Sequence, residues 1–143
     1  MAMAPHGERD VWTEGRILMS RNEGPFNLEA LQISTRKTWD ERIRLTASGP
    51  WVSIAIMQNS VMFTSEALDV VRKNMGDPAR NGNLVASAFV VAPEIEGRAL
   101  CQTIFEPIYA LAGASFGVFE TLDEAREWAL RALAESGKNA GTS

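Results

Sequence analysis

The sequence contains little of the side-chain chemistry on which most catalytic sites depend. Its 143 residues include one histidine, one cysteine and one tyrosine. A serine or cysteine nucleophile usually needs a neighbouring base, most often a histidine. The single histidine, His6, lies in residues 1–9, which we expect to form a disordered N-terminal tail. We therefore predict that the protein is not an enzyme and has no catalytic residues.

The same scarcity argues against the common metal and cofactor sites. One cysteine, Cys101, cannot form an intrachain disulfide or a cysteine-rich zinc site. The glycines are scattered and match neither the dinucleotide-binding nor the phosphate-loop pattern. A carboxylate-only magnesium site stays open. Glu94 and Glu96 follow the strand-like segment 84–92, but they flank the start of a predicted helix, where the helix dipole favours negative charge. We expect no metal and no cofactor, and we interpret Cys101 as a buried, inert thiol.

Neither a basic excess nor a long apolar run is present. Lysine and arginine total 14 against 18 aspartates and glutamates, and the net charge is −4. This balance argues against a nucleic-acid partner, since phosphate contacts dominate such binding. No stretch approaches the roughly 18 apolar residues that span a bilayer. The first residues do not show the basic start followed by an apolar run that is typical of a signal peptide. We expect a cytoplasmic protein without a transmembrane segment.

Strand-like and helix-like segments alternate along the chain, which predicts a single α/β domain over residues 10–135. Glu14 and Gly15 are expected to divide the first strand region into a short hairpin. Small and polar residues dominate 136–143, which we expect to form a disordered C-terminal tail. The strand-like segments are 11–21, 51–58, 84–92 and 115–120.

The first two helix-like segments have clear start and stop signals. Asn27 is expected to cap the first helix, which Gly49 and Pro50 end. Thr64 or Ser65 is expected to cap the second. Residues that recur at three- or four-residue steps predict the inner face of the first helix as Leu28, Leu31, Thr35, Trp39, Ile43 and Thr46.

The last two helices differ in how regular they look. A helix over 94–112 contains Pro107, which lacks a backbone donor and predicts a kink or break near Glu106. The final helix begins with a capping box formed by Thr121 and Glu124, followed by an apolar stripe.

The closing segment 118–125, followed by Trp128-Ala129-Leu130, suggests a family. With the apolar strand 84–92 and the segments 24–27 and 93–99, it resembles the STAS-like superfamily in its bacterial, SpoIIAA-like branch. The resemblance covers about residues 10–135. It implies a mixed sheet of four to five strands with about four packed helices, which acts by binding rather than by catalysis.

The resemblance also implies a place for a partner or switch surface. In anti-sigma-factor antagonists, a serine at the start of a helix after a central strand is phosphorylated. The matching stretch, 59–66, lacks the aspartate and glycine that flank the serine in that family. A helix cap is the simpler interpretation of Ser65. The residues assigned to this surface are Ser60, Met62, Phe63, Thr64 and Ser65.

Two functions from different classes follow, and an enzyme using carboxylates or Cys101 is a weaker third. The first is a regulatory module that binds a protein partner through an exposed apolar patch containing Met62 and Phe63. The alternative is a domain that binds a small apolar ligand or lipid in a pocket at the carboxyl ends of the strands. Either would be compatible with a homodimer. The expected pocket residues are Gln58, Asn59, Arg98 and Tyr109.

Overall fold

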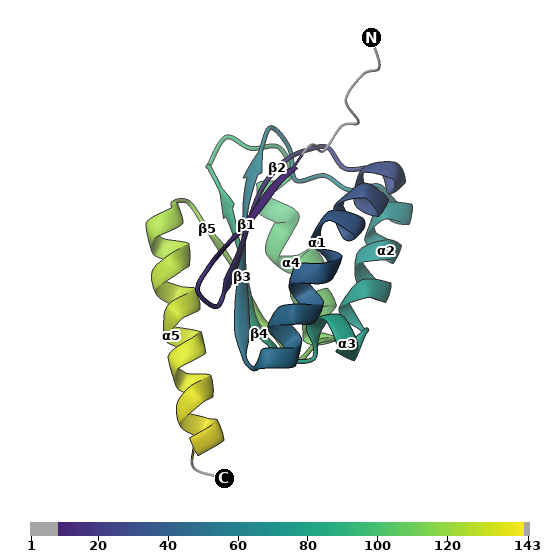
Figure 1. Ribbon diagram of the computed structural model, residues 1–143. Helices are drawn as coiled ribbons and strands as arrows, with labels where there is room; N and C mark the ends of the chain where they lie inside the picture. The colour runs from purple at the N-terminus through teal and green to yellow at the C-terminus, as the bar shows by residue number, and fades with distance from the viewer. Residues whose placement is uncertain (1–8, 142–143) are drawn as a thin grey trace.

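Five strands form one mixed sheet in the computed structural model, which describes residues 9–141 (Figure 1). The strands lie side by side in chain order, with β1 antiparallel to β2 and all later neighbours parallel. The predicted hairpin is confirmed: Gly15, with φ of 59°, occupies the turn. The strands are β1 (Arg9–Glu14), β2 (Ile17–Glu23), β3 (Trp51–Gln58), β4 (Leu84–Val91) and β5 (Ser115–Phe119).

Helices cover both faces of the sheet. In Figure 1, α1 (Leu28–Ser48), α2 (Ser65–Met75), α3 (Pro78–Asn81) and α4 (Arg98–Ala110) lie on one side, and α5 (Leu122–Gly141) lies on the other. Connections between parallel neighbouring strands are almost always right-handed, so strands in consecutive order place their connecting helices on one face. The chain is thus a single α/β domain with a five-stranded mixed sheet and, over residues 9–141, five helices, one more than expected.

The limits of the domain differ from the predicted ones at the C-terminal end. Helix α5 continues to Gly141, so residues 136–141 are helical where the composition predicts a tail. Small and polar residues do not by themselves stop a helix that the preceding turns have nucleated. The predicted N-terminal tail, apart from Arg9 in β1, lies outside the described residues, as do residues 142 and 143.

The predicted helix starts are confirmed where a side chain caps them. The side-chain oxygen of Asn27 accepts a hydrogen bond from the backbone N–H of Ala30 at 2.9 Å. Thr64 accepts from the N–H of Ala67 at 3.1 Å, so Thr64 rather than Ser65 caps α2. Thr121 accepts from the N–H of Glu124 at 3.2 Å. Each cap satisfies a donor that the helix itself leaves free.

Helix α4 differs from its prediction at its start, and it is not broken at its proline. It begins at Arg98, because Gly97 adopts a left-handed conformation with φ of 87° that interrupts the helix. It then runs through Pro107 without a break. The proline removes the donor to the carbonyl of Thr103, which lies on the exposed side of α4, where water can replace that donor.

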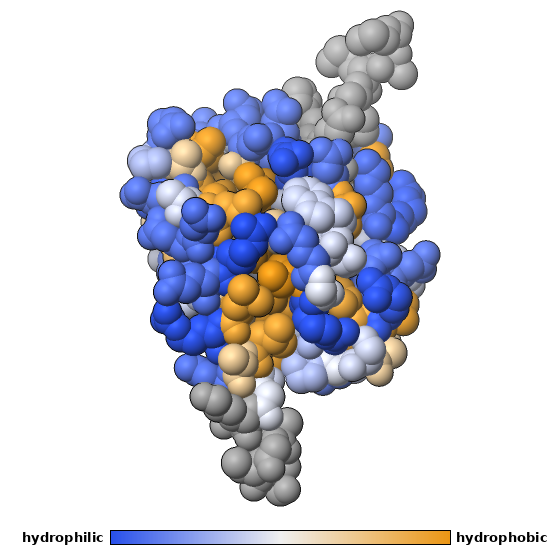
Figure 2. Space-filling view, turned by 60° about the vertical axis from the view of Figure 1, so that its left-hand side comes forward, coloured by the Kyte–Doolittle hydropathy of each residue, from blue (hydrophilic) through white to orange (hydrophobic). Residues whose placement is uncertain are grey.

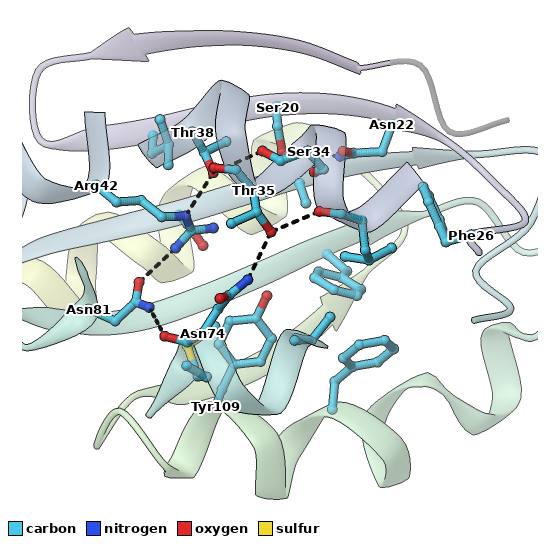
Figure 3. Close-up of a pocket in the computed structure, with 18 of the residues that line it drawn as sticks. Ser20, Asn22, Phe26, Ser34, Thr35, Thr38, Arg42, Asn74, Asn81 and Tyr109 are labelled. Carbon is cyan, nitrogen blue, oxygen red and sulfur yellow. Dashed lines mark hydrogen bonds between the residues drawn. The ribbon is translucent and has the colours of Figure 1, made fainter. Parts of the chain in front are cut away.

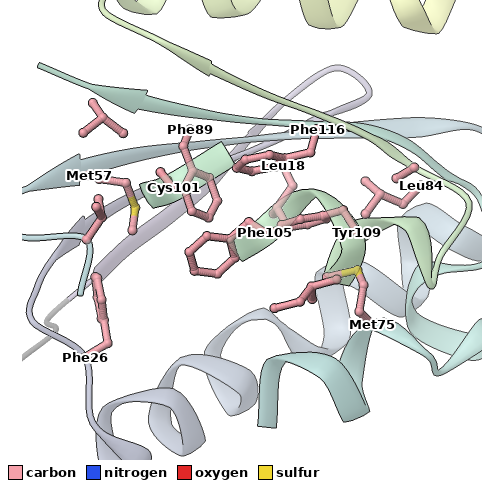
Figure 4. Packing of buried hydrophobic residues seen from close by; sticks show 14 of the residues in the cluster. Leu18, Phe26, Met57, Met75, Leu84, Phe89, Cys101, Phe105, Tyr109 and Phe116 are labelled. Carbon is pink, nitrogen blue, oxygen red and sulfur yellow. The ribbon is translucent and has the colours of Figure 1, made fainter. Parts of the chain in front are cut away.

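Two apolar clusters fill the space on either side of the sheet. Rings from β4, α4 and β5 dominate the cluster under α1, α2 and α4, where Phe105 is 1% exposed (Figure 4). The cluster under α5 consists of smaller side chains, and Ala125 and Ala129 of α5 lie directly on the sheet. The predicted apolar stripe of α5 is therefore confirmed.

The inner face of α1 is only partly the predicted one: Leu31 packs against the apolar cluster and Thr46 donates to the Arg80 carbonyl, but two other predicted residues do not point inward. Trp39 and Ile43, expected to point inward, are 40% and 37% exposed. The buried residues of α1 are Ala30, Ser34, Thr38 and Leu45. The helix thus turns a largely polar face toward the sheet, which a search for apolar periodicity does not detect. This polar face forms one wall of a cavity.

Candidate functional site: a cavity under the first helix

A cavity of about 90 Å³ lies between the sheet and helices α1, α2 and α4 (Figure 3). Its apolar lining comes from the sheet, from α1, α2 and α4, and from the two connections that follow β2 and β3. Among the described residues, no aspartate, glutamate or histidine lines it. The polar lining residues are Ser20, Asn22, Ser34, Thr35, Thr38, Arg42, Ser53, Asn74, Arg80, Asn81 and Tyr109.

Helix α1 supplies the polar wall with three residues spaced by four positions. Because a helix repeats every 3.6 residues, Ser34, Thr38 and Arg42 lie above one another on a single face. The Thr38 hydroxyl donates to the Ser34 carbonyl at 3.2 Å, and the Arg42 Nε donates to Thr38 Oγ1 at 3.3 Å. A chain of hydrogen bonds therefore holds Arg42 in place along the helix.

Arg42 is held by neutral partners and aromatic rings. Its Nη1 donates to Asn81 Oδ1 at 2.8 Å, and its guanidinium lies 5.6 Å from the centre of the Trp51 ring. Burial lowers the pKa of Arg42, while Tyr109 opposes this shift and Arg80 adds to it. An arginine stays protonated in a protein even so. Across residues 9–141, no carboxylate lies within 4.0 Å of Arg42.

Arg80 is the second cationic side chain of the lining, and it has a counter-charge. Its Nε lies 3.3 Å from Asp77 Oδ2, and its guanidinium stacks 3.3 Å from the centre of the Trp39 ring. Asn74 accepts a hydrogen bond from Arg80 and donates one to Thr35 Oγ1 at 2.8 Å. Arg80 is therefore neutralised locally and ties α3 to α1 and α2.

Aromatic rings form the other end of the cavity. Phe26 and Phe63 lie 4.5 Å apart between ring centres, and Phe63 lies 5.0 Å from Phe105. Backbone hydrogen bonds hold the first two together: the Phe26 N–H donates to the Met62 carbonyl at 2.8 Å, and the Thr64 N–H donates to the Phe26 carbonyl at 3.0 Å. The connections after β2 and β3 thus close the cavity with an apolar wall.

Of the four residues predicted to line a pocket, only Tyr109 lines this cavity. The other three lie in structural contacts at the carboxyl ends of the strands. The carbonyl of Gln58 accepts from the N–H of Gly24 at 3.0 Å, and the Asn59 amide donates to the Gly24 carbonyl at 2.7 Å. Arg98 Nε donates to the Val91 carbonyl at 2.9 Å. The cavity lies alongside the sheet rather than beyond the ends of its strands.

The residues predicted to form a partner surface point in different directions. Met62 is 37% exposed, whereas Phe63 packs inward against Phe26 and lines the cavity. Ser60 is buried, and its hydroxyl donates to Glu96 Oε1 at 2.9 Å. Thr64 caps α2, and Ser65 is exposed at its first position. Met62 and Phe63 therefore do not form a shared exposed patch.

Large exposed apolar side chains are distributed over several elements instead. Figure 2 shows one face on which apolar side chains form a strip that hydrophilic side chains interrupt. Within the described part of the chain, the large apolar residues with more than a third of their surface exposed are Trp39, Ile43, Met62, Leu100, Leu111 and Leu130.

Cys101 is buried in α4, as predicted, with 1% of its surface exposed. Burial raises the pKa of its thiol to about 12, against the opposing effect of Arg98. Only the thiolate reacts readily with iodoacetamide. At about pH 8 we therefore expect no alkylation of the folded protein over an hour, as measured by intact mass. The same protein unfolded in guanidinium should gain one adduct, and modification of the folded protein at the same rate would contradict the burial.

Comparisons with protein-family models, with curated protein sequences and with solved structures find no match. None of the helices in the described range is long and apolar enough to cross a membrane. The same range contains no group of three or more histidine, cysteine, aspartate or glutamate residues that could hold a metal ion.

Proposed function

We propose that this protein is a non-catalytic binding domain that holds a small organic ligand in the cavity between the sheet and α1, α2 and α4. The observation that carries the proposal is an internal space with an apolar wall and many polar groups. Typical ligand sites combine apolar surface with a few fixed polar groups in this way. A tightly packed core would instead fill such a space with side chains.

The lining chemistry favours binding over catalysis. The hydroxyl groups of Thr35 and Thr38 donate to backbone carbonyls, and that of Ser53 bonds to a second serine. No imidazole or carboxylate of residues 9–141 joins them in the lining as a base. The lining offers hydrogen-bond donors and acceptors together with fixed positive charge. These groups can orient a ligand but do not activate a nucleophile.

We retain the STAS-like family as a hypothesis for the fold. The resemblance implies a mixed sheet of four to five strands with packed helices, and the five-stranded mixed sheet and its helices support that hypothesis. In such a module, ligand occupancy under α1 would change how firmly α1 and α2 are held against the sheet. The binding proposal does not depend on the family.

Filling the cavity tests the proposal. Ala55 lies on β3 and lines the cavity, so Ala55→Leu places three additional carbon atoms in that space. We expect the variant to bind small organic molecules at least about tenfold more weakly than the unchanged protein. Binding is measured from amide chemical shifts during titration with phenylacetate, hexanoate, benzyl alcohol and indole.

Ala132→Leu is the matched control. Ala132 packs against the apolar cluster under α5, on the opposite side of the sheet from the cavity. The control makes the same chemical change and should leave the affinities unaltered. Equal affinity of the Ala55→Leu protein and the unchanged protein would contradict binding in this cavity.

A further inference from the structure

We propose that the ligand is a small organic acid whose carboxylate pairs with Arg42 and whose apolar part lies against Phe26, Phe63 and Phe105. The inference rests on the proposed function and adds the chemical class of the ligand. It follows from the distribution of charge and apolar surface along the cavity.

The charge of the lining is unbalanced. Arg42 and Arg80 are its two charged side chains, and no acidic residue of the described chain lines the space with them. Asp77 lies beside Arg80 at 3.3 Å, but Arg42 has no such partner within residues 9–141. One positive charge therefore lies at the cavity without a counter-ion from the described protein, although the whole chain carries a net charge of −4.

Arg42 also has donors to spare for a ligand. A guanidinium has five N–H groups in a planar fork that matches a carboxylate. The hydrogen bonds to Thr38 and Asn81 use Nε and Nη1, and they fix the orientation of the plane. Preorganised in this way, Arg42 would lose little further side-chain freedom when an acid binds.

The two ends of the cavity differ in character. In Figure 3, Arg42 and Asn81 lie at one end and Phe26 at the other, with Ser34 and Thr35 between them. A water molecule needs about 10–15 Å³ of such space, so a volume of about 90 Å³ accepts a compact molecule equivalent to roughly six to nine waters. A short aliphatic acid or a single-ring aromatic acid fits this size and polarity.

A buried charge without a partner is costly, and this cost predicts selectivity for an acid. Removing a guanidinium from water is unfavourable unless an opposite charge and further hydrogen bonds compensate it. A bound carboxylate supplies both, whereas the corresponding amide supplies hydrogen bonds alone. We therefore expect the acid to bind at least about tenfold more tightly than its amide.

The experiment compares acid and amide pairs of nearly equal shape on the full-length protein. Phenylacetate and phenylacetamide are each titrated into the protein, as are hexanoate and hexanamide. The dissociation constants are taken from the chemical shifts of the protein's backbone amide groups. The expected result is a preference for both acids in the unchanged protein. Arg42→Gln should remove the preference by weakening acid binding at least about tenfold more than amide binding.

Two further variants distinguish the effect of the Arg42 charge from a general effect of the substitution on the folded protein. Arg44 lies two residues along α1, is exposed and pairs with Glu41, so Arg44→Gln makes the same substitution outside the cavity and should keep the preference. Arg42→Lys keeps the charge but loses the fork and should retain part of the preference. Equal binding of acid and amide by the unchanged protein overturns the inference even where an Arg42 variant does not fold.

The outcomes distinguish this inference from the proposed function. Equal binding of acid and amide, or binding of benzyl alcohol and indole without the acids, would overturn the inference and leave a ligand-binding cavity. A preference for the acids that survives in a folded Arg42→Gln protein would also overturn it. Absence of binding by every probe in the unchanged protein would overturn both.

Discussion

Replacing Gly24 with alanine should lower the free energy of unfolding by more than about 4 kcal/mol, because the new methyl group has no space. A Cβ atom at Gly24 would lie 2.0 Å from the carbonyl oxygen of Ser60 and 2.9 Å from its carbonyl carbon. Both are backbone atoms, so no side-chain rotation relieves the overlap. The connection after β2 would have to separate from the connection after β3.

That separation would break the closure of the cavity. The Gly24 N–H donates to the Gln58 carbonyl, and the Gly24 carbonyl accepts from the Asn59 amide. Two residues further along, the Phe26 N–H donates to the Met62 carbonyl, and this backbone pairing positions the apolar wall of the cavity. Any folded Gly24→Ala protein should therefore also lose binding of the organic probes.

Denaturant unfolding followed by circular dichroism measures the effect, and Gly137→Ala provides the control. Gly137 lies in α5, and a methyl group there would meet no other heavy atom within 4 Å, so alanine should raise helix stability by about 0.5–1 kcal/mol. An unchanged unfolding midpoint for Gly24→Ala would show that the two connections do not approach each other as closely as described.

Much of the fold was predictable from the sequence because its signals are local. Asn27 and Thr64 cap their helices with their own side chains, and Gly15 permits the hairpin turn through its positive φ. Strand β4 is buried along nearly its whole length, as its apolar run predicts. Signals of this kind involve residues that are close together in the chain, so they can be recognised from the sequence alone.

The cavity was not predictable in the same way. Its groups meet across long separations: Arg42 contacts Asn81, 39 positions away, and Asn74 contacts Thr35, also 39 positions away. Tyr109 is the one predicted pocket residue that lines the cavity, and its place there follows from the packing of α4. Gln58, Asn59 and Arg98 were assigned to a pocket, but they form hydrogen bonds with the backbone instead.

The polar face of α1 shows why the apolar pattern misled. Trp39 and Ile43 recur at helical spacing, yet Trp39 covers the guanidinium of Arg80 near the surface rather than entering the core. Thr38 is buried because its hydroxyl donates to the Ser34 carbonyl and accepts from Arg42. A serine, threonine and arginine at steps of four residues is the sequence feature that could have indicated a polar inner face.

Removing the ring of Phe105 should produce a loss of stability that a ligand can partly reverse. Phe105 is 1% exposed and contacts the rings of Phe63, Phe89 and Phe116 while lining the cavity. Large-to-small substitutions at such positions cost about 3–5 kcal/mol, part of which comes from the space left behind. Because that space joins an existing cavity, Phe105→Ala should enlarge the binding site rather than create a separate void.

A molecule that fills the enlarged site binds the folded state alone and should therefore raise its stability. Benzene or indole at about one hundred times its dissociation constant should recover about 2.7 kcal/mol of the loss, as measured by denaturant unfolding with and without the compound. Phe119→Ala is the control, because Phe119 packs against Trp128 under α5, away from the cavity. A larger gain in the Phe105 variant than in the unchanged protein and the Phe119 variant, at the same concentration of compound, would place the new space next to the ligand site. No gain, or an equal gain in all three proteins, would contradict that placement.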